Sequence, residues 1–156
     1  AGGHHSWESL DDLLTSTYGG TGKGLKGVLA PYDGLSRGII TALQGVGMGP
    51  TIDKALPIVT GQDAEIASVK LIADGVQSST IFKDTRNLAE QAVVATQAFL
   101  SGATPEANDT ETYDNGVKVV PSFLLPVVTI YSDNIQKELV DTGYWTADEV
   151  KSGVAS

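Results

Sequence analysis

The chain has 156 residues, 41% of them apolar and 19% charged, which is the composition of a globular domain with a core of its own. Its formal net charge of −9 argues against a nucleic acid or an anionic lipid surface as partner, because like charges repel. The absence of cysteine excludes disulfides, thiolate metal sites and cysteine nucleophiles. There is no run of about 18 apolar residues, so we expect no membrane span, and any export leader would precede this chain.

The first element that the sequence predicts is a helix over residues 7–17, with Ser6 as its N-cap. Residues 1–6, which include two adjacent histidines, are interpreted as the remnant of a tag and not as part of the domain. The glycine-rich stretch over residues 19–24 fails the spacing of a phosphate-binding loop, so it is interpreted as a flexible connection.

Three short apolar segments, each followed by a helical pattern, make up the middle of the chain. The predicted strands are residues 27–30, 56–60 and 79–82. The predicted helices that follow them are residues 34–45, 64–74 and 86–100. This alternation with short connections predicts an α/β fold in which a parallel sheet is covered by helices, a three-layer αβα arrangement.

The last third of the chain begins with a polar loop over residues 103–116. An extended apolar stretch over residues 117–130 follows, broken by two prolines, and it is expected to contain the last strand. Two short helices are predicted after it, over residues 133–140 and 146–151, the second with Thr146 as its N-cap.

An aspartate stands at each of the three strand-to-helix junctions, at Asp33, Asp63 and Asp84. Helix capping explains each of them by itself. In a parallel sheet, however, ligands bind at the carboxyl ends of the strands, and a carboxylate can accept hydrogen bonds from two hydroxyls of a sugar. The sequence leaves both interpretations open, that of helix caps and that of a polyol-binding rim.

Other side chains at the same junctions would complete such a rim. Tyr32 could stack on a sugar ring or pack on the protein, and Gln62 and Lys83 could donate hydrogen bonds or lie in solvent. Trp7 is a further candidate for stacking, with simple packing as its alternative. The candidate ligand-binding residues are therefore Asp63, Tyr32, Asp33, Lys83, Gln62 and Trp7.

The sequence offers little for catalysis. Its only histidines are His4 and His5, in the presumed tag remnant, and it contains neither a nucleophile elbow nor a zinc-protease motif. Hydrolysis by a pair of the three aspartates is the one reaction left open. We expect a binding protein, with no cofactor and no metal, and not an enzyme.

Four ordered segments resemble one known family. They are residues 28–39, 57–65, 79–84 and 113–122. In this order and spacing they are similar to the pentose- and hexose-binding receptors of ABC importers, in particular to the multiple-sugar-binding and xylose-binding group. The resemblance implies a two-lobed receptor that closes on a monosaccharide, with Asp63 hydrogen-bonded to the sugar. Tyr32 and Lys83 stand where relatives carry Asn or Gln.

The resemblance also implies how the chain is divided. A whole receptor is about twice as long, so this chain would be an incomplete C-terminal lobe of a periplasmic-binding-protein-like fold. Residues 7–84 would be βα units of that lobe, and residues 85–116 would pack on the N-terminal lobe. Residues 117–156 would hold the hinge crossing, the last strand and the C-terminal helices.

The implied ligand is a pentose or hexose, and the implied partner of the intact receptor is an ABC permease. The receptor itself would lie in the periplasm or outside the cell, with a lipoprotein at the cell surface as an alternative. A truncated sheet also predicts self-association through its unpaired edge. Two other functions compete with this one. One is the effector-binding domain of a sugar-responsive transcription regulator, which the acidic net charge argues against. The other is a flavodoxin-like carrier or enzyme, for which this sequence lacks the anion-binding loop.

Overall fold

The computed structural model describes residue 10 and residues 12–156, and it divides into two compact units. The first unit comprises the described residues up to Phe82 together with Val128–Ser156, and the second is Lys83–Val127. The chain leaves the first unit after Phe82 and returns to it at Val128. These two residues are paired with each other across neighbouring strands. The predicted segment 85–116 thus falls inside the second unit, which continues to Val127.

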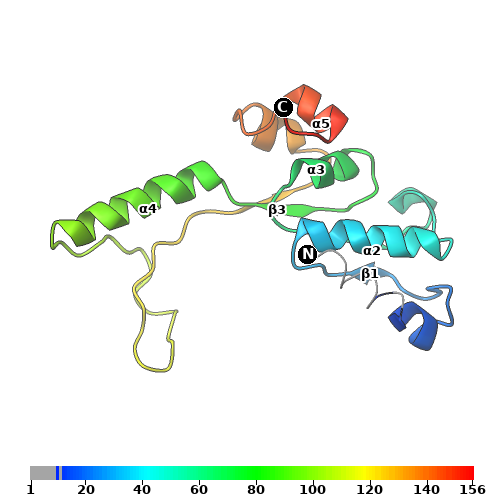
Figure 1. Cartoon of the computed structure of the whole chain (residues 1–156), viewed down its shortest axis with the longest axis horizontal. Coiled ribbons are helices and arrows are strands. Elements are labelled where there is room, and N and C mark those ends of the chain that lie inside the picture. Colours follow the sequence, from blue (N-terminus) through cyan, green and yellow to red (C-terminus); the bar gives the residue numbers. More distant parts are fainter. Residues whose placement is uncertain (1–9, 11) are drawn as a thin grey trace. The chain divides into compact units, whose positions relative to one another are not determined.

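The first unit alternates short strands and helices (Figure 1). Residues 12–17 are helical, as the sequence predicts, while His4, His5, Ser6 and Trp7 lie outside the described residues. The strands are β1 (Gly27–Val28), β2 (Ile58–Val59), β3 (Thr80–Phe82) and β4 (Val128–Ile130). The helical segments are α2 (Asp33–Gly45), the 3-10 turn η1 (Ile52–Lys54), α3 (Ile66–Ala73), the π-helical η2 (Gln136–Val140) and α5 (Ala147–Ser152).

The strands follow one another in chain order across the unit. β1 and β2 pair in parallel, and a parallel bridge between Thr60 and Ser79 continues the pairing from the end of β2 toward β3. β4 pairs with β3 in the antiparallel sense. The predicted parallel alternation therefore holds for the first three strands, and the last strand joins them in the opposite direction.

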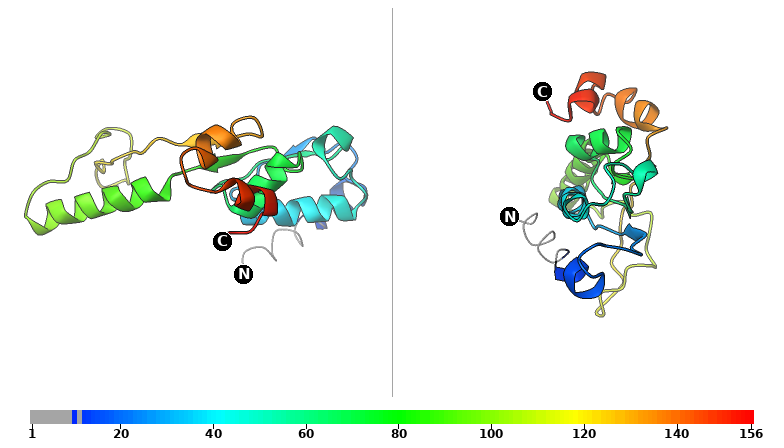
Figure 2. Two further views of the ribbon diagram at one scale, coloured as in Figure 1. Left: turned by 90° about the horizontal axis from the view of Figure 1, so that it is seen from above. Right: turned by 90° about the vertical axis from the view of Figure 1, so that its right-hand side faces the viewer.

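Helix α3 packs against both α2 and α5, as the views of Figures 1 and 2 show. Two apolar clusters form the core on either side of this packing. The first is built from the N-terminal helix, α2 and the first two strands, with Leu10, Leu14, Ile39, Ile40, Leu43, Leu56 and Val59 among its members. The second joins α3 to the last two strands and the C-terminal segment, with Val69, Ile72, Phe82, Ile130, Ile135 and Leu139.

The helix starts differ in part from the expected caps. Tyr32 occupies the N-cap of α2 and Glu65 that of α3, neither with a side-chain cap bond, so the interpretation as helix caps is wrong for Asp33 and Asp63. Asp84 does cap its helix, since its carboxylate accepts a hydrogen bond from the Arg86 N–H at 3.0 Å. Thr146 also caps its helix as predicted, in a reciprocal capping box with Glu149.

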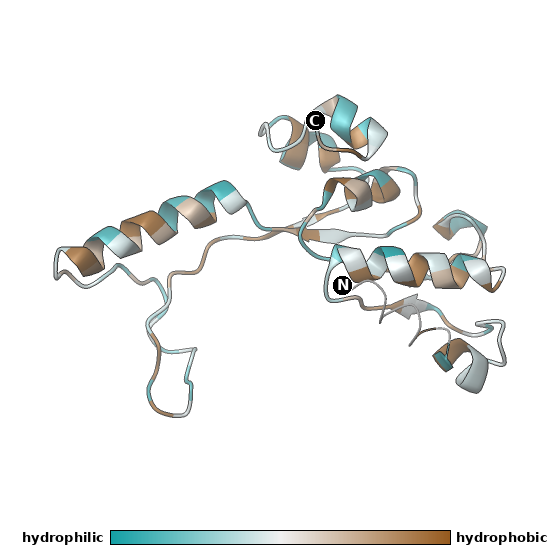
Figure 3. Ribbon diagram, viewed as in Figure 1, coloured by the Kyte–Doolittle hydropathy of each residue, from teal (hydrophilic) through white to brown (hydrophobic). Residues whose placement is uncertain are grey.

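The second unit consists of α4 (Thr85–Leu100) and an irregular return. Single bridges between Asp109 and Ser122 and between Asp114 and Val119 shape that return. Brown, hydrophobic residues recur along α4 in Figure 3, and yet none of its side chains is buried. No helix in the described part of the chain is long and apolar enough to cross a membrane.

Candidate functional site

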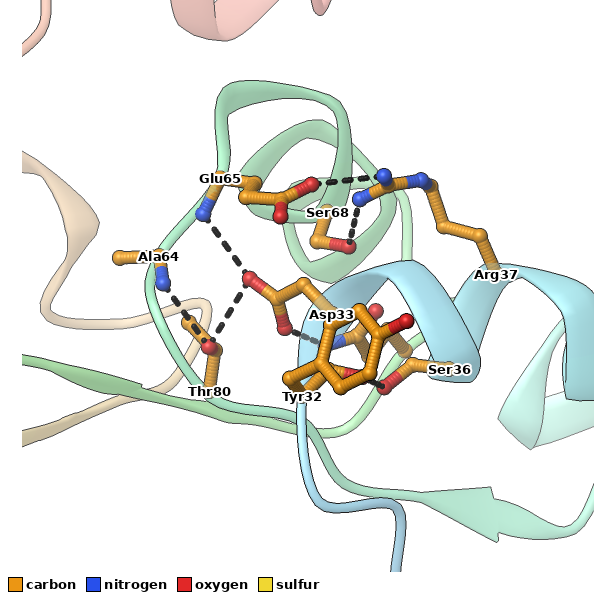
Figure 4. Close-up of polar contacts among 9 residues, drawn as sticks. Tyr32, Asp33, Ser36, Arg37, Ala64, Glu65, Ser68 and Thr80 are labelled. Carbon is orange, nitrogen blue, oxygen red and sulfur yellow. Dashed lines mark hydrogen bonds and ion pairs between the residues drawn. The ribbon is translucent and has the colours of Figure 1, made fainter. Parts of the chain in front are cut away.

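Asp33 is the centre of a polar network that joins the start of α2 to the loop after β2 and to the start of β3 (Figure 4). Its side chain is fully buried, and its carboxylate accepts hydrogen bonds from Gln77 Nε2 at 2.9 Å, the Glu65 N–H at 2.9 Å and Thr80 Oγ1 at 3.1 Å. Burial raises the pKa of Asp33 above its usual range, although these three donors pull it back. The carboxylate therefore ties the start of α2 to both neighbouring segments.

These bonds fix the loop over residues 61–65, which connects β2 to α3. The Asp33 N–H donates to the Gln62 carbonyl at 2.9 Å, and the Asp63 N–H donates to the Ile81 carbonyl at 2.9 Å. The Ala64 N–H donates to Thr80 Oγ1 at 3.1 Å. Because successive residues of the loop are bound to α2 on one side and to β3 on the other, the loop is held in one conformation.

A second set of contacts braces the two helices that flank this loop (Figure 4). Ser36 Oγ donates to the Thr60 carbonyl at 2.7 Å, which joins the first turn of α2 to the end of β2. The Arg37 guanidinium forms an ion pair with Glu65 at 2.6 Å and donates to Ser68 Oγ at 3.0 Å. The guanidinium thus spans from α2 to the N-terminal end of α3.

The predicted site residues around this network differ in how far solvent can reach them. Asp63 is exposed, and Gln62 and Tyr32 are half-buried beside it in the loop and at the N-cap of α2. The Tyr32 ring lies over Gly34, where an added Cβ would stand 2.5 Å from its Cε2 atom. Asp33, also expected to contact the ligand, is completely buried, so its carboxylate stabilises the loop and does not reach the surface.

Two candidates remain, Lys83 and Trp7. Lys83 belongs to the second unit, where it lines a pocket of about 240 Å³ with Asp84, Asn87, Leu88 and residues 123–127. The side-chain hydrogen bond from Arg86 is the main reason that the pKa of Asp84 is lowered, so this carboxylate serves the helix start. Trp7 lies outside the described residues.

Sequence reasoning missed the residues that build the network around Asp33. Gln77 and Thr80 come from the end of the α3–β3 connection and from β3, and nothing in the local pattern marks them as partners of a residue more than 40 positions earlier. Gly61 did carry a signal, because a glycine at the end of a buried strand indicates a close approach. A Cβ there would lie 2.5 Å from Gln77 Nε2 and 2.8 Å from Ser36 Oγ.

The solvent-accessible side chains beside the network are suited to binding a polar ligand. They present a carboxylate that accepts hydrogen bonds, an amide that can donate and accept, and a phenol ring with an apolar face, at Asp63, Gln62 and Tyr32. Within the described residues, no three His, Cys, Asp or Glu side chains come together in a way that could hold a metal ion.

Comparison with known proteins finds a matching family and close sequence relatives. The sequence pattern of the family described as periplasmic binding protein domain matches residues 8–104. The multiple sugar-binding periplasmic receptor ChvE of Rhizobium radiobacter is 55% identical over 142 residues, which are 91% of this chain and 39% of that receptor. The multiple sugar-binding periplasmic protein SbpA of Azospirillum brasilense is 49% identical over the same share of each chain.

Solved structures agree with the sequence relatives. An ABC transporter solute binding protein from Clostridium phytofermentans with bound β-D-glucose is 40% identical, with a TM-score of 0.81 over 94% of this chain and 43% of that one. One from Chloroflexus aurantiacus in complex with D-glucose, also 40% identical, has a TM-score of 0.79 over 94% and 41%. The expected fold, part of a periplasmic-binding-protein-like lobe, is thereby confirmed, and the chain spans about two fifths of the length of these relatives. Since the family pattern covers more than half of its residues, the chain belongs to the periplasmic binding protein family.

Proposed function

We propose that this chain is part of a monosaccharide-binding receptor of an ABC import system, and that the loop over residues 61–65 belongs to its sugar site. The observation that carries the proposal is the exposed Asp63 on a loop that hydrogen bonds hold from both sides. A carboxylate on a loop held in this way can accept hydrogen bonds from two sugar hydroxyls, and the backbone that carries it loses little freedom on binding. The glucose found in two solved relatives supports a sugar as ligand.

The proposed roles follow from the chemistry of each side chain. Asp63 accepts hydrogen bonds from hydroxyls, Gln62 adds an amide beside it, and Tyr32 offers its ring to the apolar face of the sugar. Lys83, which follows the last residue of β3, donates to a further hydroxyl. Asp33 acts without touching the sugar, since its buried carboxylate holds the loop that carries Asp63. Trp7 remains a proposed stacking residue.

The proposal concerns a longer protein than this chain. Because the chain spans 39% of the ChvE receptor, we propose that the rest of the receptor supplies the second wall of the site and closes over the sugar. The intact receptor would be periplasmic, as its named relatives are, and would deliver sugar to an ABC permease without chemical change. The net charge of −9 supports the absence of a nucleic acid partner.

The test is a chimera in which this chain replaces the matching 142 residues of the Rhizobium radiobacter receptor. We expect the chimera to bind D-glucose, D-galactose, D-xylose or L-arabinose in titration calorimetry. The chain by itself should bind these sugars weakly or not at all, because the contacts of the proposed second wall and the exclusion of water are missing. A folded chimera that binds none of the four sugars contradicts the proposed function, and micromolar binding by the chain alone contradicts the two-walled site.

The role of Asp63 is tested in the same chimera. Asp63→Asn keeps the size of the side chain but removes its charge, and we expect affinity to fall about 10- to 100-fold, as for the loss of one or two charge-assisted hydrogen bonds. Asp74→Asn is the matched control, because Asp74 is an exposed carboxylate at the other end of α3 that pairs with Lys70 at 2.6 Å. Equal affinity of Asp63→Asn and the parent would remove Asp63 from the site.

A further inference from the structure

The loop that carries Asp63 has an unfavourable backbone. Asp63 has a φ of 99° and Ala64 a φ of 51°, two consecutive residues with side chains in the left-handed region. Residues other than glycine avoid this region, and they remain there only where the surrounding structure holds them. The conformation that presents Asp63 therefore depends on the contacts made to the loop.

Most of these contacts come from the neighbouring strand and helix. The N–H groups of Asp63, Ala64 and Glu65 are bound by Ile81, Thr80 and Asp33. The carbonyl of Ala64 has a different partner, because the indole Nε1–H of Trp145 donates to it at 3.0 Å from 81 residues further along the chain. The side chain of Ala64 is fully buried, so this carbonyl belongs to a residue that is enclosed by the protein.

Trp145 is itself held in place by contacts of its backbone and of its ring. Its backbone N–H donates to the Leu139 carbonyl at 3.1 Å, and its ring is nearly perpendicular to that of Tyr144 at a centroid distance of 5.3 Å. Tyr144 in turn packs edge-on against Phe82 of β3 at 4.6 Å. The capping box of α5 begins at Thr146, the next residue. The indole N–H is therefore presented by a well-anchored segment and not by a loose side chain.

We propose that Trp145 is a positioning residue for the sugar site, which holds the left-handed turn at Asp63–Ala64 through its hydrogen bond to the Ala64 carbonyl. The inference rests on the proposed role of Asp63 and extends it, since it makes the C-terminal segment a support of the ligand loop. Loss of the indole N–H would leave the loop able to relax toward ordinary backbone angles, and the free protein would then present Asp63 only part of the time.

The first experiment measures the loop in this chain without any sugar. Amide hydrogen exchange of residues 63–65 should accelerate about tenfold when the Trp145 N–H is removed, because one hydrogen bond that resists local opening is lost. Two variants remove it: Trp145→Phe, and replacement of Trp145 by benzothienylalanine, which has the shape of tryptophan with sulfur in place of the N–H. Tyr131→Phe, a half-exposed aromatic in the same C-terminal segment, is the control and should leave the exchange unchanged.

The second experiment measures D-glucose affinity in the chimera that carries the same replacements. We expect a fall of about tenfold for both Trp145 variants and none for Tyr131→Phe, with melting temperatures that stay close to that of the parent. Equal exchange rates in the parent and in the benzothienylalanine protein overturn the proposal, whatever Trp145→Phe does. If the parent chimera binds no sugar, the proposed function fails, while the exchange data still decide whether Trp145 holds the loop.

Discussion

The network around Asp33 leaves no room at one backbone position. Gly61 lies where the end of β2 passes the buried carboxylate, and an added Cβ would meet Asp33 Oδ1, Gln77 Nε2 and Ser36 Oγ at once. All three of those side chains are buried and hydrogen-bonded, so none can move away without breaking a bond. The glycine is needed for close approach and not for a special backbone angle.

Gly61→Ala should therefore destabilise the fold by about 2 kcal/mol, as is usual for an overpacked interior site. The measurement is the free energy of unfolding from urea titration of this chain. Gly45→Ala is the matched control, because Gly45 is the last residue of α2 and a Cβ there would have no atom within 4 Å. The control should be neutral or stabilising by up to about 1 kcal/mol, since alanine favours helix. A Gly61→Ala variant as stable as the control would contradict the packing argument.

The sequence could indicate the edge of the site but not the roles within it. Asp33 and Asp63 are the same residue type at equivalent strand-to-helix junctions, and the local pattern does not distinguish them. What separates them is burial, because Gln77 and Thr80 cover Asp33 while the loop turns Asp63 outward. Those partners lie 44 and 47 residues away, so only the folded chain brings them together.

At the scale of elements, helices were predicted more closely than strands. Helix α5 carries its own start signal in Thr146 and Glu149, and its cap lies where the local sequence indicates. Strand lengths depend on pairing with distant segments, so the expected strand over residues 56–60 shortens to Ile58–Val59. The direction of β4 likewise depends on its partner β3 and not on its own residues.

The capping box of α5 predicts a pH dependence of stability. Glu149 accepts hydrogen bonds from the N–H groups of Ser156 at 2.7 Å and Thr146 at 2.8 Å, and these bonds lower the pKa of its carboxyl to about 2. A carboxyl whose pKa is lowered by folding contributes stability above its unfolded pKa, here 4.5, and loses that contribution as the pH falls toward 2.

Glu149→Gln should therefore be less stable than the parent near neutral pH, and the difference in free energy of unfolding should shrink between about pH 5 and pH 2. Urea titrations at a series of pH values measure this difference. Thr146→Ala removes only the Thr146 Oγ1 donor, 2.9 Å from the Glu149 carboxylate, and keeps the backbone N–H, so it should give a smaller pH effect of the same sign. A difference between Glu149→Gln and the parent that stays constant down to pH 2 would disprove the coupling.

At the scale of the whole chain, the two units differ in how well they bury their apolar residues. The first unit contains both core clusters, whereas no residue of Lys83–Val127 is buried. Large apolar side chains stand exposed along the second unit, among them Phe99 at 71%, Leu100 at 83% and Val117 at 90%. The overall fold class could be inferred from the alternating pattern, whereas the helical periodicity of α4 looks like that of any packed helix. Only the family resemblance, which assigns residues 85–116 to packing on the N-terminal lobe, implied that this helix lacks its partner here.

Such exposed surface predicts that the chain self-associates, because contact between copies would remove these side chains from water. Light scattering after size exclusion should show oligomers whose share grows with protein concentration. Replacing Phe99 and Leu100 together by serine should shift the chain toward monomer, since each buried side chain of this size contributes about 1.5–3 kcal/mol to association. Val154→Ser is the control, because Val154 is 66% exposed but belongs to the first unit, and it should leave the distribution unchanged. A parent chain that remains monomeric at the highest attainable concentration would contradict this prediction.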